Sequence, residues 1–232
     1  MNEHTSKKFD AELEGIRTRV LQMGGMVELQ IVKAMEGLSD GDLLLIDQVI
    51  ENDNRVNHLE IELDEACNQV IAKRQPTAVD LRMISTVQKT ITDLERIGDE
   101  AKKIAKTAKQ LHTTGSNFTP QIRLAHIATA VVDMLRTSLD AYARLDTISA
   151  AQVVRQDKEV DAEFKGIMRQ LITYMMEDPR TISQSIELMF VAKSVERIGD
   201  HAKNIAEYVV YMVKGRDVRH TSLEEIEREA TR

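Results

Sequence analysis

The amino-acid sequence predicts an all-α protein made of two tandem three-helix bundles related by internal duplication. Hydrophobic residues make up 42% of the chain and charged residues 30%, whereas only 3% are aromatic and there is no tryptophan. This balance is typical of helical bundles rather than of sheets. In addition, the pentapeptide ERIGD occurs twice, at residues 95–99 and again at 196–200. A motif repeated about 100 residues apart indicates two copies of one structural unit.

Three long helices are predicted in the first half, over residues 8–37, 43–73 and 77–112. Apolar residues recur every three or four positions along the first of them, as a helix with one buried face requires. The segment SDGD at 39–42 interrupts the periodicity, and Pro76 marks the start of the third helix. These residues form the first predicted domain, 8–112.

The second half repeats this pattern, with helices predicted over about 120–145, 148–177 and 180–214. Thr119 and Pro120 at the end of TTGSNFTP are suited to a helix cap and first turn, so this segment is predicted to join the domains. Asp146 is a candidate cap for the fifth helix, and Pro179 is expected to start the sixth. The second domain is predicted over 119–215, and residues 216–232 are expected to form a charged tail or frayed helix.

Charge and composition exclude several classes of protein. The formal net charge of −7 argues against the cationic surface that nucleic-acid binding needs. A single cysteine, Cys67, cannot form an intrachain disulfide, and no charged-then-apolar leader precedes Phe9, so a cytoplasmic protein is expected. The apolar run YVVYMV at 208–213 is much shorter than the ~20 residues of a membrane span. Any membrane association is therefore expected to be peripheral.

Both copies of ERIGD place two acidic residues four positions apart. Glu95 and Asp99, like Glu196 and Asp200, would therefore lie on one helix face, where like charges weaken the helix. The second helix carries Asp53 and Asn57 next to its apolar positions. Burying a carboxylate costs several kcal/mol unless it is paired or binds a metal. We therefore expect these acids to have a function beyond helix stability.

Folding the helices back on each other brings these polar residues together. If the second hairpin turns near Gln75, residues 95 and 99 lie level with about residues 55 and 51. The same construction near Asp178 pairs the fifth helix with the sixth. The sequence thus predicts two metal sites, one formed by Asp53, Asn57, Glu95 and Asp99 and the other by Asp157, Asp161, Glu196 and Asp200.

Such oxygen donors suit Mg²⁺ or Mn²⁺ best, with iron and zinc as alternatives. Because Asn57 is neutral and Asp161 is charged, the second site is expected to bind a metal ion more tightly. Glu60 and Asp64 are expected to lie too far from the level of Glu95 to share its ion. His201 is expected on the surface.

Enzyme motifs are missing from the sequence. HExxH, GxxxxGK[ST] and GxSxG do not occur, nor does the ExxH of di-iron bundles, so no residue is nominated as a nucleophile or a base. A non-enzymatic protein is the main expectation, and a carboxylate-ligated metalloenzyme on a helical bundle is the alternative.

The sequence resembles the PhoU family, the accessory regulators of bacterial phosphate-specific transport. The resemblance covers about residues 8–215 and rests on the doubled ERIGD-x-A-K-x-I-A, together with RTRVLQMGGMVE, IAKRQPTAVDLR and YMVKGRD. It implies two three-helix bundles, a homodimer, and Mg, Mn, Zn or iron-type ions at Glu95, Asp99, Glu196 and Asp200. It also implies a regulator that links the phosphate ABC transporter ATPase to a sensor histidine kinase and represses the phosphate-starvation regulon.

Overall fold

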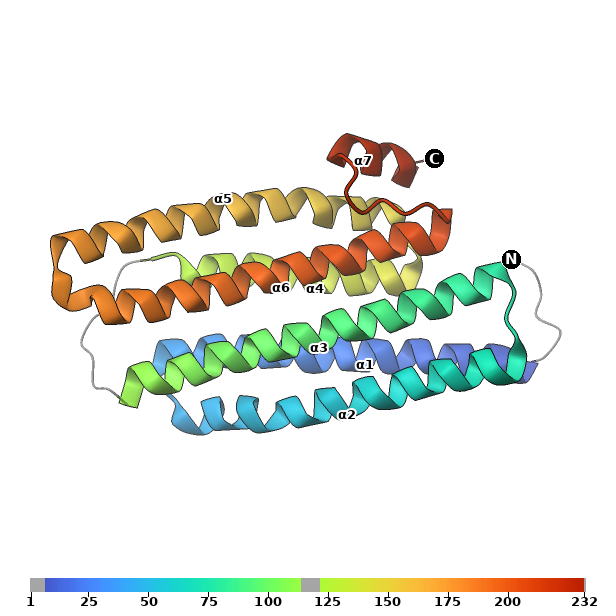
Figure 1. Ribbon diagram of the computed structural model, residues 1–232, viewed down its shortest axis with the longest axis horizontal. Helices are drawn as coiled ribbons and strands as arrows, with labels where there is room; N and C mark the ends of the chain where they lie inside the picture. Colours follow the sequence, from blue (N-terminus) through green and yellow to red (C-terminus); the bar gives the residue numbers. More distant parts are fainter. Residues whose placement is uncertain (1–6, 114–121, 232) are drawn as a thin grey trace.

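The computed structural model describes residues 7–113 and 122–231, and these residues are almost entirely helical (Figure 1). No β-strand occurs among them. In chain order the elements are α1 (Lys7–Asp40), α2 (Leu43–Arg74), α3 (Ala78–Thr113), α4 (Leu124–Arg144), α5 (Thr147–Glu177), the 3₁₀ turn η1 (Pro179–Thr181), α6 (Ile182–Lys214) and α7 (Leu223–Thr231). The predicted all-α fold class is confirmed.

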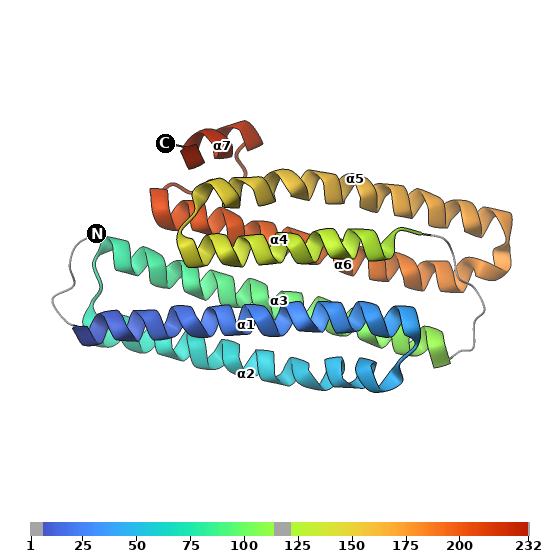
Figure 2. The ribbon, with the colours of Figure 1, turned by 180° about the vertical axis from the view of Figure 1, so that it is seen from behind.

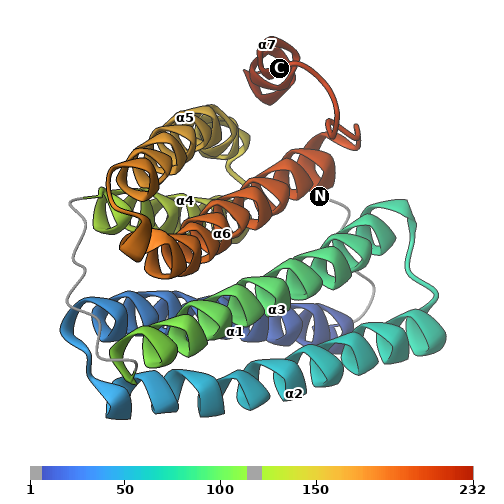
Figure 3. The same cartoon turned by 60° about the vertical axis from the view of Figure 1, so that its left-hand side comes forward.

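The helices form two three-helix bundles that lie side by side, α1–α3 in one and α4–α6 in the other (Figures 1 and 2). Viewed from the side, α3 and α6 face each other between the bundles, and α1 packs against α4 (Figure 3). One continuous cluster of buried apolar residues runs through both bundles. The halves therefore share a core, which burial of apolar surface stabilises.

Matching caps show the duplication at the level of single residues. Asp42 begins α2, and its carboxylate accepts hydrogen bonds from the backbone N–H groups of Leu44 and Leu45. Asp146 caps α5 in the same way, as predicted, accepting from the N–H groups of Ile148 and Ser149. Such caps satisfy N–H groups that have no partner within the helix, so each hairpin turns at a defined residue.

Two boundaries differ from the expectation. Helix α4 begins at Leu124, later than the predicted start near residue 120, and Thr119 and Pro120 lie outside the described residues. Pro179 begins the short turn η1, and α6 follows it from Ile182. Proline fits the first turn of a helical segment because it has no N–H to donate. Here the first turn is a 3₁₀ helix, and the α-helix follows it.

The segment after Gly215 is better ordered than a frayed helix. It contains α7, which packs against α5 and buries Ile226 and Ala230. The Thr147 hydroxyl donates a hydrogen bond to the carbonyl of Ala230 at 2.7 Å, and Arg155 pairs with Glu227. A charged segment is held in place here because two apolar residues on one face reach the outside of the second bundle.

Buried polar pairs cross the interface between α3 and α6. His201 Nδ1 lies 2.6 Å from Asp93 Oδ1, and both side chains are buried, so the expectation of a surface histidine is wrong. The Ser194 hydroxyl donates to buried Glu100 at 2.8 Å, and Arg197 also pairs with Glu100. Helical position alone does not reveal this burial, because the covering helix comes from the other bundle.

None of the helices within the described ranges is both long enough and apolar enough to cross a membrane.

We predict that Asp93→Asn lowers the free energy of unfolding by about 2 kcal/mol, because the buried imidazole of His201 loses a charge-assisted hydrogen bond. Chemical denaturation measures this change. The control is Glu51→Gln at an exposed position on α2, which should shift stability by less than about 0.5 kcal/mol. If Asp93→Asn and Glu51→Gln changed the free energy of unfolding equally, the pair of Asp93 and His201 would not stabilise the fold.

Candidate functional site

The first predicted site lies between α2 and α3, and its most deeply buried member is Asp53. The side chain is fully buried, and Oδ2 accepts a hydrogen bond from Lys102 Nζ at 2.7 Å. Asn57 Nδ2 donates to the same oxygen at 3.4 Å. Within the described residues, Oδ1 of Asp53 and Oδ1 of Asn57 are buried without a hydrogen-bond partner. Two oxygens here thus need a donor or a cation.

Glu95 and Asp99 belong to the same site. The pKa of Glu95 is raised, first by burial and then by the nearby charges of Asp99, Glu60 and Asp53. Like charges disfavour the ionised form in this way only when they are close. Asp53, Asp99 and Glu60 are thus near enough to Glu95 to act on its charge, and Asn57 is joined to them through its hydrogen bond to Asp53.

Glu60 lies nearer to Glu95 than the predicted pairing of the helices placed it, since its charge contributes to the raised pKa of Glu95. The hydroxyl of Thr92 donates to Glu60 Oε1 at 3.4 Å, so the level of residue 60 on α2 is that of residue 92 on α3. The connection between Arg74 and Ala78 is centred on Pro76 and not on Gln75. Residue 95 is consequently level with about residue 57 and not 55, a shift of about half a turn that brings Glu60 nearer to Glu95.

The second site has the same plan between α5 and α6. Lys203 Nζ lies 2.8 Å from Oδ2 of buried Asp157. The pKa of Asp200 is raised by burial, with further contributions from the charges of Glu196 and Asp157. Asp161 is half-buried one helical turn after Asp157. Glu196 also pairs with Lys193 at 2.5 Å.

The prediction missed the lysine in each site. Lys102 and Lys203 are the lysines of the repeated ERIGD-x-A-K motif, and each binds the buried aspartate of the neighbouring helix. The sequence held a signal for this lysine. Lys102 follows Glu95 by seven positions, which is almost two full helical turns, so both residues lie on the same helix face. The repeated lysine therefore belongs to the repeated site as much as the acids do.

Gln30 is a second residue that the sequence did not reveal. It lies on α1, is 4% exposed, and both atoms of its amide lack a hydrogen-bond partner in the described structure. A Cβ atom at Gly98 would lie 3.3 Å from Gln30 Oε1 and 3.5 Å from Asp53 Oδ1. Gly98 therefore allows a close approach of the helices, and the polar groups meet where α3 has no side chain.

The donor atoms have the right chemistry for a hard divalent cation, since they are carboxylate and amide oxygens. Within the described residues, however, no three carboxylate, histidine or cysteine side chains are close enough to hold one ion. The ammonium of Lys102 or Lys203 supplies the positive charge at each buried aspartate instead. The unpartnered oxygens of Asp53 and Asn57 favour the first site for a metal ion.

This duplicated arrangement matches a known domain. The PhoU domain family matches the chain twice, over residues 20–108 and 124–209. The chain belongs to the PhoU family. Each match covers the three helices of one bundle, so the two bundles are two PhoU domains, and each contains one ERIGD motif.

Relatives resemble the chain over almost its whole length. It is 46% identical to the Pseudomonas aeruginosa homologue of the phosphate-specific transport system accessory protein PhoU, over 99% of this chain and 95% of that one. It is 48% identical to the Escherichia coli protein of that name, over 98% of this chain and 94% of the relative. The crystal structure of PhoU from P. aeruginosa superimposes with a TM-score of 0.87 at 47% identity, covering 90% of this chain and all of that one.

The Streptococcus pneumoniae phosphate transport system regulatory protein PhoU has the same fold at lower identity. Its crystal structure gives a TM-score of 0.84 at 26% identity, over 90% of this chain and 99% of that one.

Glu207 is a further titratable group of this PhoU chain, two turns beyond Asp200 on α6. Only 7% of the residue is exposed, and burial raises the pKa of its carboxyl from 4.5 to about 7. The opposing attraction of Lys203 is smaller than this desolvation. Charging Glu207 therefore costs the folded state more than the unfolded chain, where the carboxylate is hydrated.

We predict that Glu207→Gln flattens the dependence of stability on pH. The folded protein retains the proton between pH 4.5 and about 7 while the unfolded chain releases it, so native stability falls as pH rises through this window. The loss amounts to at most about 3 kcal/mol. Thermal melts should show the variant more stable than the native chain above pH 7, with the gap closing toward pH 4.5.

The matched control is Glu159→Gln, which changes an exposed glutamate on α5. Its melting temperature should follow that of the native chain at each pH. Parallel curves for Glu207→Gln and the native chain would show that the carboxyl is hydrated in the folded state.

Proposed function

We propose that this protein is a regulatory adaptor of phosphate uptake, which connects a phosphate-specific ABC transporter to a sensor histidine kinase and represses phosphate-starvation genes when phosphate is plentiful. The observation that supports this most strongly is 48% identity to the E. coli accessory protein of the phosphate-specific transport system, over 98% of this chain. We expect it to act in the cytoplasm as a homodimer, contacting the transporter through its ATPase.

An adaptor fits the relatives and the site better than an enzyme does. The curated relatives are named as accessory proteins of a transport system, in agreement with the expectation of a non-enzyme. In both sites a lysine ammonium contacts the buried aspartate, as expected of a charge-balanced scaffold. The alternative of a carboxylate-ligated metalloenzyme has no comparable support.

Metal binding is a second part of the proposal, and the unpartnered oxygens of Asp53 and Asn57 support it. We infer that a divalent ion, Mg²⁺ or Mn²⁺ before iron or zinc, binds where the carboxylates converge and moves the lysine ammonium aside. The first site should bind more tightly, because it gains Glu60, whereas Lys193 neutralises Glu196 in the second. This ranking reverses the one that the neutral Asn57 suggested.

Deleting the protein should leave phosphate-starvation genes expressed in high phosphate, which a reporter fused to such a gene measures. Replacing Glu95, Asp99, Glu196 and Asp200 together should give a weaker effect in the same direction. Complementation with the native chain restores repression and serves as the control. A reporter that stays repressed in the deletion strain would refute the regulatory role.

Calorimetric titration with Mn²⁺ tests the two metal sites. Glu95→Gln/Asp99→Asn should remove the tighter binding phase, and Glu196→Gln/Asp200→Asn should leave it. Lys102→Gln should tighten the first site roughly tenfold, because it removes the competing ammonium. Lys106→Gln, at an exposed position on the same helix, is the control. If the tight phase disappears only in the second double variant, the ranking is wrong, and if no variant changes the titration, these residues do not bind metal.

A further inference from the structure

Gln30 is a polar residue on the otherwise apolar buried face of α1. Its neighbours on that face, Val27, Ile31 and Ala34, are fully buried, and Gln30 itself is 4% exposed. Neither Oε1 nor Nε2 of its amide has a hydrogen-bond partner within the described residues. Burying an amide in this state destabilises the fold, because the group loses its hydrogen bonds to water. Packing of α1 alone therefore does not explain a glutamine at this position.

Two oxygens of α2 lack a donor in the same region. Oδ1 of Asp53 and Oδ1 of Asn57 are buried without a partner in the described structure, whereas Oδ2 of Asp53 accepts from Lys102. A Cβ atom at Gly98 would lie 3.3 Å from Gln30 Oε1 and 3.5 Å from Asp53 Oδ1, so both oxygens approach the same point of α3. Acceptor oxygens that converge without a donor repel one another, and a cation bound among them removes this repulsion.

The second domain has an apolar side chain at the position of this glutamine. Met134 on α4 corresponds to Gln30 on α1, and the two are separated by the same number of residues as Asp53 and Asp157. Met134 lies beside Gly199, and its Cε is 3.8 Å from a Cβ atom built there. An amide is therefore not needed for this helix contact, because a thioether fills the same place in the duplicated bundle.

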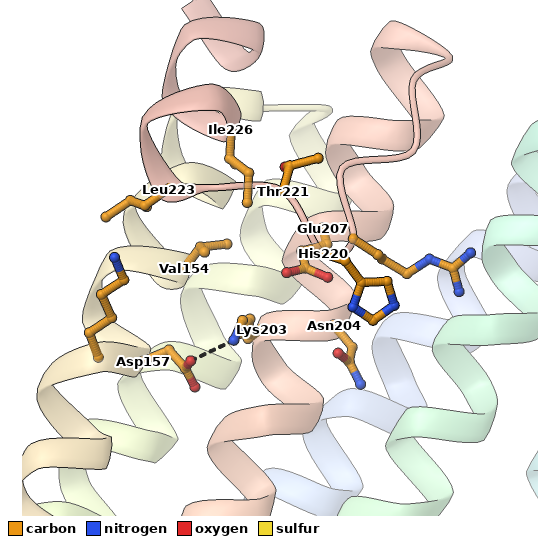
Figure 4. A pocket seen from close by; sticks show the side chains of 11 residues that line it. Val154, Asp157, Lys203, Asn204, Glu207, His220, Thr221, Leu223 and Ile226 are labelled. Atoms are coloured by element: carbon orange, nitrogen blue, oxygen red, sulfur yellow. Dashed lines mark hydrogen bonds and ion pairs between the residues drawn. The ribbon is translucent and has the colours of Figure 1, made fainter.

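Asp157, the counterpart of Asp53, has different surroundings. It lines a pocket of about 300 Å³, where Lys203 contacts it at 2.8 Å (Figure 4). Water that enters this pocket can donate hydrogen bonds to the carboxylate. Asp53 is fully buried, so its second oxygen depends on a donor or a cation inside the first bundle. The unmet demand of the buried aspartate is therefore greater in the domain that contains Gln30.

We propose that the amide oxygen of Gln30 is a ligand for the divalent cation of the first domain, supplied by α1. This inference rests on the metal binding proposed above for the first site. Within the described residues no three carboxylate, histidine or cysteine side chains are close enough to hold one ion. Gln30 Oε1, together with Oδ1 of Asp53 and Oδ1 of Asn57, supplies the additional oxygen donors. Neutral amide oxygens are ordinary ligands of hard cations, and they add no repulsion between like charges.

Calorimetric titration with Mn²⁺ tests this role in a parent protein that carries Glu196→Gln/Asp200→Asn, so that the second site does not contribute. Gln30→Met copies the residue of the second domain and should weaken binding about tenfold, because one oxygen ligand is lost. Gln30→Glu keeps an oxygen at the position and should bind Mn²⁺ at least as tightly as the parent. Met134→Gln, the reciprocal substitution, is the matched control and should leave the Kd unchanged.

Thermal melts of the chelator-treated proteins provide a readout that does not depend on bound metal. Gln30→Met should raise the melting temperature by roughly 2–4 °C, because it replaces a buried amide without a partner by an apolar side chain of similar length. Added Mn²⁺ should then stabilise this variant less than it stabilises the parent.

The outcomes separate the role of Gln30 from metal binding itself. If the parent binds Mn²⁺ and Gln30→Met leaves the Kd unchanged, Gln30 is not a ligand and the proposal is overturned. Equal weakening by Met134→Gln would overturn it as well, because the effect would then not be specific to the first site. A parent that binds no Mn²⁺ refutes metal binding by the first site, and this inference with it.

Discussion

The packing of α3 against α6 joins the two domains, and buried polar pairs determine how these helices meet. Asp93 of α3 contacts His201 of α6, and Ser194 of α6 donates to Glu100 of α3. In the duplicated motif Asp93 corresponds to Ser194, and Glu100 to His201. The same two positions therefore pair reciprocally across the interface. Any sliding of one helix along the other would leave buried polar groups without partners, which costs more than lost apolar contact alone.

This constraint also positions the carboxylates. With one face of α3 held against α6, the face carrying Glu95, Asp99 and Lys102 turns toward α2, and α6 presents its own copy to α5. Gly98 lies between the two faces and lets Gln30 and Asp53 come close to α3. One short motif thus contributes to the domain interface and to a charged site, because a helix can use several faces over three turns.

Duplication has produced similar frameworks with different details. In the first domain, Glu60 and the buried amide of Gln30 lie near the acids of the motif. In the second domain, the apolar side chain of Met134 lies beside Gly199, where the first domain has Gln30 beside Gly98. The second domain has Lys193 beside Glu196 and a C-terminal segment that covers one end of the bundle. The two domains therefore have the same backbone fold but differ in the charged side chains of their sites.

The sequence by itself determined the helical fold, the duplication, most helix boundaries and the helix faces on which the acids of the two motifs lie. These follow from local rules, namely apolar periodicity, capping residues and the four-residue spacing of like charges. Only the tertiary structure decided that His201 is buried, that the charge of Glu60 acts on Glu95, and that lysines contact the aspartates. Each of these depends on how two helices are packed against each other, and a shift of about half a turn along the helix axis changes which side chains touch.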